Sequence, residues 1–218
     1  WTGGADCPEA IRDAFAAKFG LPVLATYGLS EAPTVVAIDH RSGAGHVEGG
    51  SGRPLPHLAV RIRADDGTER PAGEPGEVCV GPADGRYRTM LGYLGRPEAT
   101  AEALVDGELR TGDIGLLDDD GVLHIRDRKS LLIIRGGANV YPAEVERVLL
   151  AQPGVAGAAV LGVPDDRLGE RVAAVVEPAA GGTVDSEALR AALAEEVARY
   201  KVPERIAVVD ALPRNAMG

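Results

Sequence analysis

Apolar residues occur along the chain either at helical spacing or in short continuous runs, and these two patterns predict helices and short strands. Three apolar side chains at helical spacing predict a helix over 8–19, and a glycine ends it. A continuous apolar run predicts a buried strand over 23–26, which leads directly into Tyr-Gly-Leu-Ser-Glu at 27–31. Open α/β sheets place ligands at the carboxyl ends of their strands, so this polar cluster is a candidate binding site.

The middle of the chain has the pattern of a small β-rich subdomain that begins near residue 52. Asp66-Gly67 and Asp120-Gly121 are turn dipeptides, and short apolar runs lie between such turns. The predicted strands cover 59–63, 76–80 and 121–125.

A change of pattern near residue 130 predicts a domain boundary. The next elements are a strand over 131–134, a glycine loop and a helix that begins at Pro142, a residue that needs no backbone N–H in a first helical turn. Two strands, a helix and a last strand complete a separate α+β unit, at 156–163, 171–177, 186–198 and 205–209.

Charge and cysteine content exclude several classes of function. The 23 basic and 33 acidic side chains leave a net charge of −10, which repels polyanions and argues against nucleic acid as a partner. Cys7 and Cys79 lie far apart without neighbouring ligand residues, which disfavours a disulfide framework or a zinc site. No apolar run reaches the roughly 18 residues of a membrane helix, and no signal peptide is visible, so we expect a cytoplasmic protein.

The cluster at 27–31 has the parts needed to hold a nucleotide and its metal. The ring of Tyr27 can stack on a base, Gly28 permits close backbone approach, and Ser30 can hydrogen-bond a phosphate oxygen. Glu31 can supply a hard oxygen to Mg²⁺. A helix N-cap formed by Ser30 explains the same residues equally well.

Two further clusters carry charge next to glycine. Arg-Thr-Gly-Asp at 110–113 is predicted to be a turn that presents Asp113, whose two oxygens suit the neighbouring hydroxyls of a ribose. A basic stretch around Arg128 precedes Gly136 and Gly137; its guanidinium can hold phosphate or ribose oxygens, and the paired glycines leave room for a narrow chain. In isolation, a common Gly-Asp turn and a solvated basic strand edge are the favoured interpretations.

The order and spacing of these motifs are more specific than any one of them. Taken together, they resemble the adenylate-forming superfamily, which comprises acyl-CoA synthetases, luciferases and the adenylation domains of nonribosomal peptide synthetases. The matching segments are a glycine turn at 3–5, Tyr-Gly-Leu-Ser-Glu, Arg-Thr-Gly-Asp, Asp-Arg-Lys followed by Arg-Gly-Gly-Ala-Asn-Val-Tyr-Pro-Ala-Glu-Val-Glu, and Leu-Pro-Arg-Asn-Ala-Met-Gly at 212–218.

The resemblance implies a role for each candidate residue. Glu31 would be the catalytic residue that binds Mg²⁺, and Leu131 would be the hinge. Gly136 and Gly137 would line the passage through which the thiol of CoA arrives. The nucleotide, ATP or its product AMP, would be held by Gly3, Gly4, Ala5, Thr26, Tyr27, Gly28, Ser30, Asp113 and Arg128.

The resemblance also implies the domain organisation and the fold class, α/β. Residues 1–130 would form the end of a large α/β domain with its β-rich subdomain, and residues 131–218 a small α+β lid domain. The family hinge is usually Asp or Lys where this chain has Leu131, and the family lysine that follows Gly218 and the upstream phosphate-gripping loop are not in this sequence. We therefore expect the chain alone not to complete adenylation.

The favoured function is that of an acyl-CoA synthetase, which activates a carboxylic acid with ATP and transfers the acyl group to CoA. A fatty or other hydrophobic acid is the expected substrate. One alternative is an acyl-AMP ligase or adenylation domain that loads a carrier protein, and a second is a binding fragment without chemistry of its own.

Overall fold

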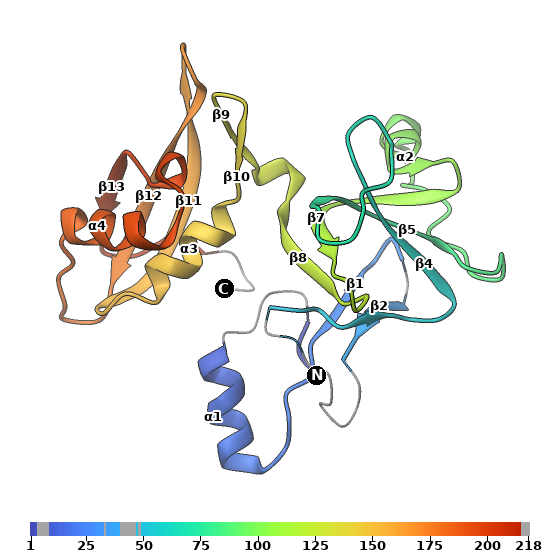
Figure 1. Cartoon of the computed structure of the whole chain (residues 1–218), viewed down its shortest axis with the longest axis horizontal. Coiled ribbons are helices and arrows are strands. Elements are labelled where there is room, and N and C mark those ends of the chain that lie inside the picture. Colours follow the sequence, from blue (N-terminus) through green and yellow to red (C-terminus); the bar gives the residue numbers. More distant parts are fainter. Residues whose placement is uncertain (4–8, 33, 40–46, 48, 215–218) are drawn as a thin grey trace. The chain divides into compact units, whose positions relative to one another are not determined.

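The computed structural model describes residues 1–3, 9–32, 34–39, 47 and 49–214. Its contacts divide the chain into two compact units, Trp1–Arg126 and Asp127–Gly218. Each unit has its own cluster of buried apolar side chains. The elements are labelled in Figure 1.

The first unit begins with a helix and a small antiparallel sheet. The predicted helix is confirmed as α1 (Glu9–Phe19), and it ends at Gly20, which adopts a left-handed φ of 66°. Strands β1 (Thr26–Leu29), β2 (Thr34–Ile38) and β3 (Arg53–Pro54) form a three-stranded sheet in that order. The strand predicted over 23–26 is therefore wrong in its bounds.

The reason for this error lies in the pairing partners. Ala25 makes only an isolated parallel bridge to Thr2, whereas Thr26–Leu29 pairs along its length with Thr34–Ile38. The polar cluster consequently lies in a β-hairpin and its turn, not beyond the end of a buried strand. The alternative in which Ser30 caps a helix is also wrong, because a strand follows it.

A second sheet of five strands completes the first unit. Its strand order is β4-β5-β7-β6, and β8 pairs with β7. The predicted strands at 59–63 and 76–80 are confirmed, and the one at 121–125 begins later, at Leu123. The elements are β4 (Leu58–Arg63), β5 (Gly76–Pro82), α2 (Pro97–Ala103), β6 (Leu104–Val105), β7 (Glu108–Leu117) and β8 (Leu123–Arg128).

One apolar core joins the two sheets of this unit. Val36 of β2 belongs to the same buried cluster as Val78 and Val80 of β5 and Leu109 of β7. Burial of such side chains stabilises a fold by roughly 1.5–3 kcal/mol each relative to exposure. The β1–β2 hairpin is therefore held on the larger sheet by burial.

The second unit packs two helices on a five-stranded sheet. Its sheet has the order β10-β9-β12-β11, and β13 runs parallel beside β12. A 3₁₀ turn replaces the start of the strand predicted over 131–134; the later predicted strands and helices are confirmed, with shifted ends. The elements are a 3₁₀ turn (Lys129–Leu131), β9 (Ile133–Arg135), β10 (Ala138–Val140), α3 (Pro142–Leu150), β11 (Val155–Asp165), β12 (Gly169–Pro178), α4 (Ser186–Glu196), a second 3₁₀ turn (Arg199–Lys201) and β13 (Arg205–Val208).

Alternating positions on β12 form the floor of this core. Val172, Ala174 and Val176 point to one face of the sheet, as the period of two in a strand requires, and all three are buried. Helices α3 and α4 cover that face with five buried residues, Val145, Val148, Leu149, Leu189 and Leu193.

A carboxylate outside α3 caps that helix. Asp127 accepts a hydrogen bond from the backbone N–H of Ala143 at 2.9 Å, while the N-cap residue Tyr141 provides no side-chain cap. We expect Asp127→Ala to lower the free energy of unfolding by about 1 kcal/mol, because a helix N–H loses its acceptor. Urea unfolding measures this loss, and Asp127→Asn, which keeps an acceptor oxygen, should retain most of the stability. Equal losses in the two variants would show that the cap is not the cause.

The thiol of Cys79 lies in the core of the first unit. Its residue is 1% exposed, and burial raises the pKa of the thiol from 9.0 to about 11. We therefore expect Cys79 in the folded chain to resist iodoacetamide at about pH 8, and to react once urea unfolds the chain. The raised pKa also means that stability falls as pH rises from 9.0 toward about 11, because the unfolded thiol ionises first. Rapid labelling of the Cys79 peptide in the native state, read by mass spectrometry, would contradict this prediction.

No helix in the described part of the chain is both long enough and apolar enough to cross a membrane.

Candidate active site

Asp113 projects from a β-bulge in the middle of a long strand. Glu77 lies opposite Ile114 and Cys79 lies opposite Arg110, so β7 has extra residues between these two pairs. Gly112 within the bulge has a φ of 72°, which glycine adopts without steric strain. The turn predicted at 110–113 is therefore wrong: the motif forms a bulge inside a strand.

Side chains around the bulge hold it in place. The hydroxyl of Thr111 donates to the carbonyl of Val78 at 2.8 Å and accepts from the backbone N–H of Asp113 at 3.1 Å. The buried carboxylate of Glu77 accepts from the N–H of Gly112 at 3.3 Å. Because a bulge turns a side chain out of the regular alternation, this arrangement fixes the direction of the Asp113 carboxylate.

Tyr27 and Asp113 are brought together from distant parts of the sequence. The Tyr27 hydroxyl donates to Oδ2 of Asp113 at 2.5 Å, across 86 positions. Asp113 is only 4% exposed, and a short hydrogen bond to a carboxylate is strong in such surroundings. The ring of Tyr27 and the carboxylate of Asp113 therefore form one rigid pair.

Thr2 and Gly3, at the start of the chain, lie against the beginning of β1. Thr26 donates to the carbonyl of Thr2 through its backbone N–H at 2.8 Å and through its hydroxyl at 3.0 Å. A Cβ atom at Gly3 would lie 2.4 Å from the Thr26 hydroxyl oxygen, so only glycine fits there. The structure thus places Gly3 beside Thr26; Gly4 and Ala5 lie outside the described residues.

The remaining members of the first cluster lie at the tip of the β1–β2 hairpin. A Cβ at Gly28 would lie 3.1 Å from the carbonyl oxygen of Thr34, so the partner strand also favours a small residue here; the contact of Gly28 with a nucleotide stays a prediction. Ser30 is exposed in the turn, where its hydroxyl faces solvent. Glu31 follows it and accepts a hydrogen bond from the hydroxyl of Tyr93 at 2.9 Å.

Glu31 fits the role of a single carboxylate ligand for Mg²⁺. Among the described residues, Tyr93 is its only side-chain partner, and it engages only Oε1. No group of three or more His, Cys, Asp or Glu side chains in this part of the chain forms a metal cage. Mg²⁺ commonly binds one or two carboxylates together with the phosphates of a substrate, so one carboxylate is a suitable donor set.

The other candidate residues belong to the second unit. Arg128 ends β8 and is exposed at the side chain, and Leu131 ends the 3₁₀ turn with 57% exposure. Gly136 and Gly137 form the turn between β9 and β10, with φ values of 59° and 83°. The approach of Arg128 to Asp113 and Glu31 stays a prediction.

Sequence reasoning missed three residues of the site. Thr111 and Glu77 hold the bulge, and Tyr93 holds Glu31, but neither Glu77 nor Tyr93 lies in a motif that points to this function. Thr111 lies inside Arg-Thr-Gly-Asp, and its position next to Gly112 was the one sequence signal for its role in the bulge. The partners of the other two are fixed only by the fold.

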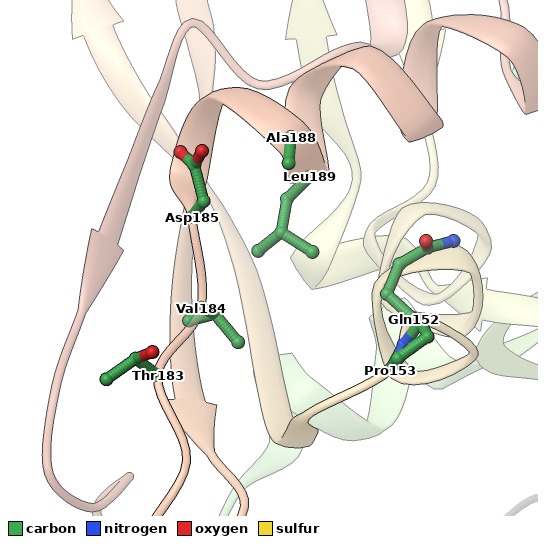
Figure 2. A pocket seen from close by; sticks show the side chains of 7 residues that line it. All are labelled: Gln152, Pro153, Thr183, Val184, Asp185, Ala188 and Leu189. Atoms are coloured by element: carbon green, nitrogen blue, oxygen red, sulfur yellow. The ribbon is translucent and has the colours of Figure 1, made fainter.

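A small pocket of the second unit contains none of the predicted site residues. Its volume is about 160 Å³, and it lies between the end of α3 and the segment that enters α4. Figure 2 shows Gln152 and Pro153 on one side and Asp185, Ala188 and Leu189 on the other. Asp185 accepts the backbone N–H of Glu187 as a helix cap, and the side-chain amide of Gln152 donates to the carbonyl of Val148 at 3.2 Å.

Two family models match the chain. That of the AMP-binding enzymes matches residues 1–94, and that of the AMP-binding enzyme C-terminal domain matches residues 144–218. Among curated proteins, a feruloyl-CoA synthase of an Amycolatopsis species is 42% identical over 217 residues, covering 99% of this chain and 43% of the relative. A fatty acid–[acyl-carrier-protein] ligase of Streptomyces coeruleorubidus is 41% identical over 223 residues, covering 99% of this chain and 41% of that protein.

Solved structures agree with these matches. The o-succinylbenzoate CoA synthetase of Bacillus subtilis, solved with its acyl-adenylate intermediate, superposes with a TM-score of 0.87 at 35% identity, over 99% of this chain and 43% of that one. The chain thus spans less than half the length of the proteins it matches. It has the mixed α/β fold of these enzymes. The chain belongs to the adenylate-forming superfamily of AMP-binding enzymes.

Proposed function

We propose that the protein activates a carboxylic acid with ATP and transfers the acyl group from the adenylate to CoA. The observation that carries this proposal is the Tyr27–Asp113 pair, in which a bulge turns a buried carboxylate onto an aromatic hydroxyl. An aromatic ring beside a fixed carboxylate suits a nucleoside, whose base stacks and whose ribose donates two hydrogen bonds. The relatives that act as acid–CoA ligases support the same assignment.

In the proposed site each element of AMP has a place. Asp113 accepts the hydrogen bonds of the ribose hydroxyls, and the ring of Tyr27 faces the adenine. The backbone at 3–5, with Thr26, borders the base. Ser30 at the exposed hairpin tip reaches the α-phosphate, and Arg128 adds a contact to ribose or phosphate.

The reaction has two steps that share this nucleotide. The carboxylate of the acid attacks the α-phosphorus of ATP and displaces pyrophosphate, and the thiol of CoA then displaces AMP from the acyl adenylate. Mg²⁺ held by Glu31 would offset the negative charge of the phosphates. Tyr93 orients Glu31 for that task through its hydrogen bond.

The second unit serves as a lid in this proposal. Residues 131–218 would turn about Leu131 between the two steps, and residues 1–130 would carry the nucleotide. In one orientation the lid presents the Gly136-Gly137 turn, beside which the thiol of CoA passes. The exposure of Leu131 in its 3₁₀ turn is compatible with a residue that takes part in such a motion.

The proposed acid is fatty or otherwise hydrophobic. Two of the three relatives named above are a feruloyl-CoA synthase and a fatty acid–[acyl-carrier-protein] ligase, and the acids in these two names have apolar bodies. We expect the protein to prefer such acids to small polar ones, because an apolar pocket gains roughly 0.8 kcal/mol per buried CH₂ group.

Transfer to a carrier protein is a second candidate. It is favoured by the similarity to the ligase that uses an acyl-carrier protein. The two candidates share the adenylation step and differ in what brings the thiol. A pantetheine thiol on a carrier would approach the same Gly136-Gly137 turn.

The experiment offers a panel of acids to the intact protein and measures both steps. Pyrophosphate exchange into ATP reports adenylation, and thioester formation with CoA or with a phosphopantetheinylated carrier reports transfer. The proposal predicts exchange with hydrophobic acids and thioester with CoA. Transfer to the carrier alone would favour the second candidate, and a well-folded protein without exchange or AMP binding would favour a non-catalytic binding module.

A further inference from the structure

The Gly136-Gly137 turn is braced from one side by the turn between β11 and β12. The backbone N–H of Gly136 donates to the carbonyl of Leu168 at 2.7 Å, and a Cβ at Gly136 would lie 3.4 Å from Cδ2 of Leu168. Arg135 pairs with Gly169 at the same point. This short pairing is the only ladder contact between β9 and β12 among the described residues, so few backbone bonds join the β9–β10 hairpin that contains the turn to β12.

A chain of alternating charges runs around the same contact. Oε1 of Glu204 accepts from Nη2 of Arg135 at 2.6 Å, and Oε2 of Glu204 accepts from Nη1 of Arg171 at 2.9 Å. Arg171 donates in turn to Oδ2 of Asp165. Glu204 therefore joins the strand that enters the glycine turn to the strand that braces it.

The last carboxylate of this chain of charges, that of Asp165, binds backbone groups of the turn between β11 and β12. Oδ1 of Asp165 accepts from the N–H groups of Arg167 at 3.1 Å and Leu168 at 2.9 Å. Leu168 is the residue whose carbonyl receives the N–H of Gly136. A ring of interactions thus runs through Gly136, Leu168, Asp165, Arg171, Glu204 and Arg135.

Glu204 is the member on which Arg135 depends. The hydrogen bond from Arg135 lowers the pKa of the Glu204 carboxyl, which is therefore ionised at neutral pH. Nε of Arg135 is buried without a hydrogen-bond partner among the described residues, so within them the guanidinium reaches its anion through the hydrogen bond from Nη2 to Glu204. Loss of the Glu204 carboxylate would leave the guanidinium without its anion.

We propose that Glu204 is a positioning residue for thioester formation: through Arg135 and Arg171 it holds the Gly136-Gly137 turn where the thiol passes. This inference rests on the proposed function, because it assigns the turn to the second step. Glu204 lies in the loop before β13, and within the described residues its side-chain hydrogen bonds go to Arg135 and Arg171, neither of which is proposed to bind the nucleotide. Its removal should therefore impair the second step and spare the first.

The first arm of the test measures the turn directly on this chain. Hydrogen exchange, read by mass spectrometry or NMR, is compared between the native sequence and Glu204→Ala. We expect faster exchange at the amides of 135–138 and 166–168, because the ring is opened. The control is Glu187→Gln, which alters a carboxylate of the same unit that faces Arg190 on α4 at 3.6 Å. An unchanged exchange rate at Gly136 in Glu204→Ala overturns the inference.

The second arm measures catalysis in the intact protein with an acid that it activates. For Glu204→Ala, kcat/KM for CoA should fall about 10- to 100-fold through misplacement of the turn, while pyrophosphate exchange changes little. For Glu204→Gln, which keeps one acceptor oxygen, kcat/KM for CoA should lie between the values of Glu204→Ala and the native protein. Glu187→Gln should match the native protein. Equal losses in both steps would show a merely structural role and overturn the inference.

The two proposals fail in different ways. If no acid supports pyrophosphate exchange in the native protein, the proposed function is wrong. The hydrogen-exchange measurement alone then decides whether Glu204 braces the turn. If exchange into ATP is normal and thioester formation is unaffected by Glu204→Ala, the proposed function stands and the positioning role is wrong. A double variant, Arg135→Ala with Glu204→Ala, should be no worse than either single change if the residues act as a unit.

Discussion

Asp113→Ala is expected to weaken AMP binding about 100-fold or more. Two hydrogen bonds from ribose hydroxyls to a carboxylate contribute about 3 kcal/mol together, and the alanine removes both acceptors. The same change leaves the Tyr27 hydroxyl without the partner that it holds at 2.5 Å, so the ring also loses its fixed position. Isothermal calorimetry with AMP and Mg²⁺ measures the effect.

Two further variants separate binding from folding. Asp113→Asn keeps one carbonyl oxygen for Tyr27 and should give an intermediate affinity. Asp84→Ala removes an exposed carboxylate of the same unit that pairs with Arg86 at 2.9 Å, and it should bind AMP as the native chain does. Native affinity in a well-folded Asp113→Ala variant would contradict the assignment of this carboxylate to the ribose.

Gly52→Ala is expected to cost about 4 kcal/mol of stability, which combines backbone strain with overpacking. Gly52 has a φ of 90°, and a Cβ there would lie 2.1 Å from the carbonyl carbon of Ile38 and 2.4 Å from the nitrogen of Asp39. Both neighbours are backbone atoms at the end of β2, the strand that pairs with β3, and at the residue after it, so they cannot rotate away as a side chain could. Urea unfolding followed by circular dichroism measures the loss.

Gly85→Ala is the matched control for this prediction. Gly85 has a φ of 76°, but nothing lies within 4 Å of the position that its Cβ would take. Its substitution should therefore cost only the backbone term, about 1 kcal/mol. Similar losses for the two variants would show that the close contact with Ile38 does not determine stability.

Local patterns predicted helices α1, α3 and α4, and missed the short helix α2 and the long strand of the site. Helix α3 could be predicted because Pro142 and the apolar spacing after it act within a few residues. Strand β7 could not, because Thr-Gly-Asp has the composition of a turn and the strand forms by pairing with β5, β6 and β8, of which β5 lies far earlier in the sequence. The bulge that turns Asp113 follows from that distant register.

The candidate residues could be predicted individually, but most of their partners could not. Tyr27 and Asp113 were each assigned to the nucleotide, and the structure joins them across 86 positions. Tyr93, which holds Glu31 across 62 positions, had no local signal. A hydrogen bond between distant residues depends on how the sheets pack, and one sequence does not contain that information in a local pattern.

The glycines also show which features the sequence predicts and which depend on the fold. Gly28 was expected to permit close backbone approach, and in the structure a Cβ there would lie 3.1 Å from the carbonyl oxygen of Thr34, a tight contact that favours glycine. Gly112 was read as part of a turn, and its left-handed φ instead permits a bulge. In both cases the sequence identified a backbone requirement, and the structure identified its cause.

The most direct test of the nucleotide site is a crystal structure of the intact protein with AMP and Mg²⁺. The account predicts that both ribose hydroxyls donate to the carboxylate of Asp113 and that the adenine lies against the ring of Tyr27, with Glu31 at the metal. A nucleotide bound elsewhere, with the Tyr27–Asp113 pair far from it, would contradict the account.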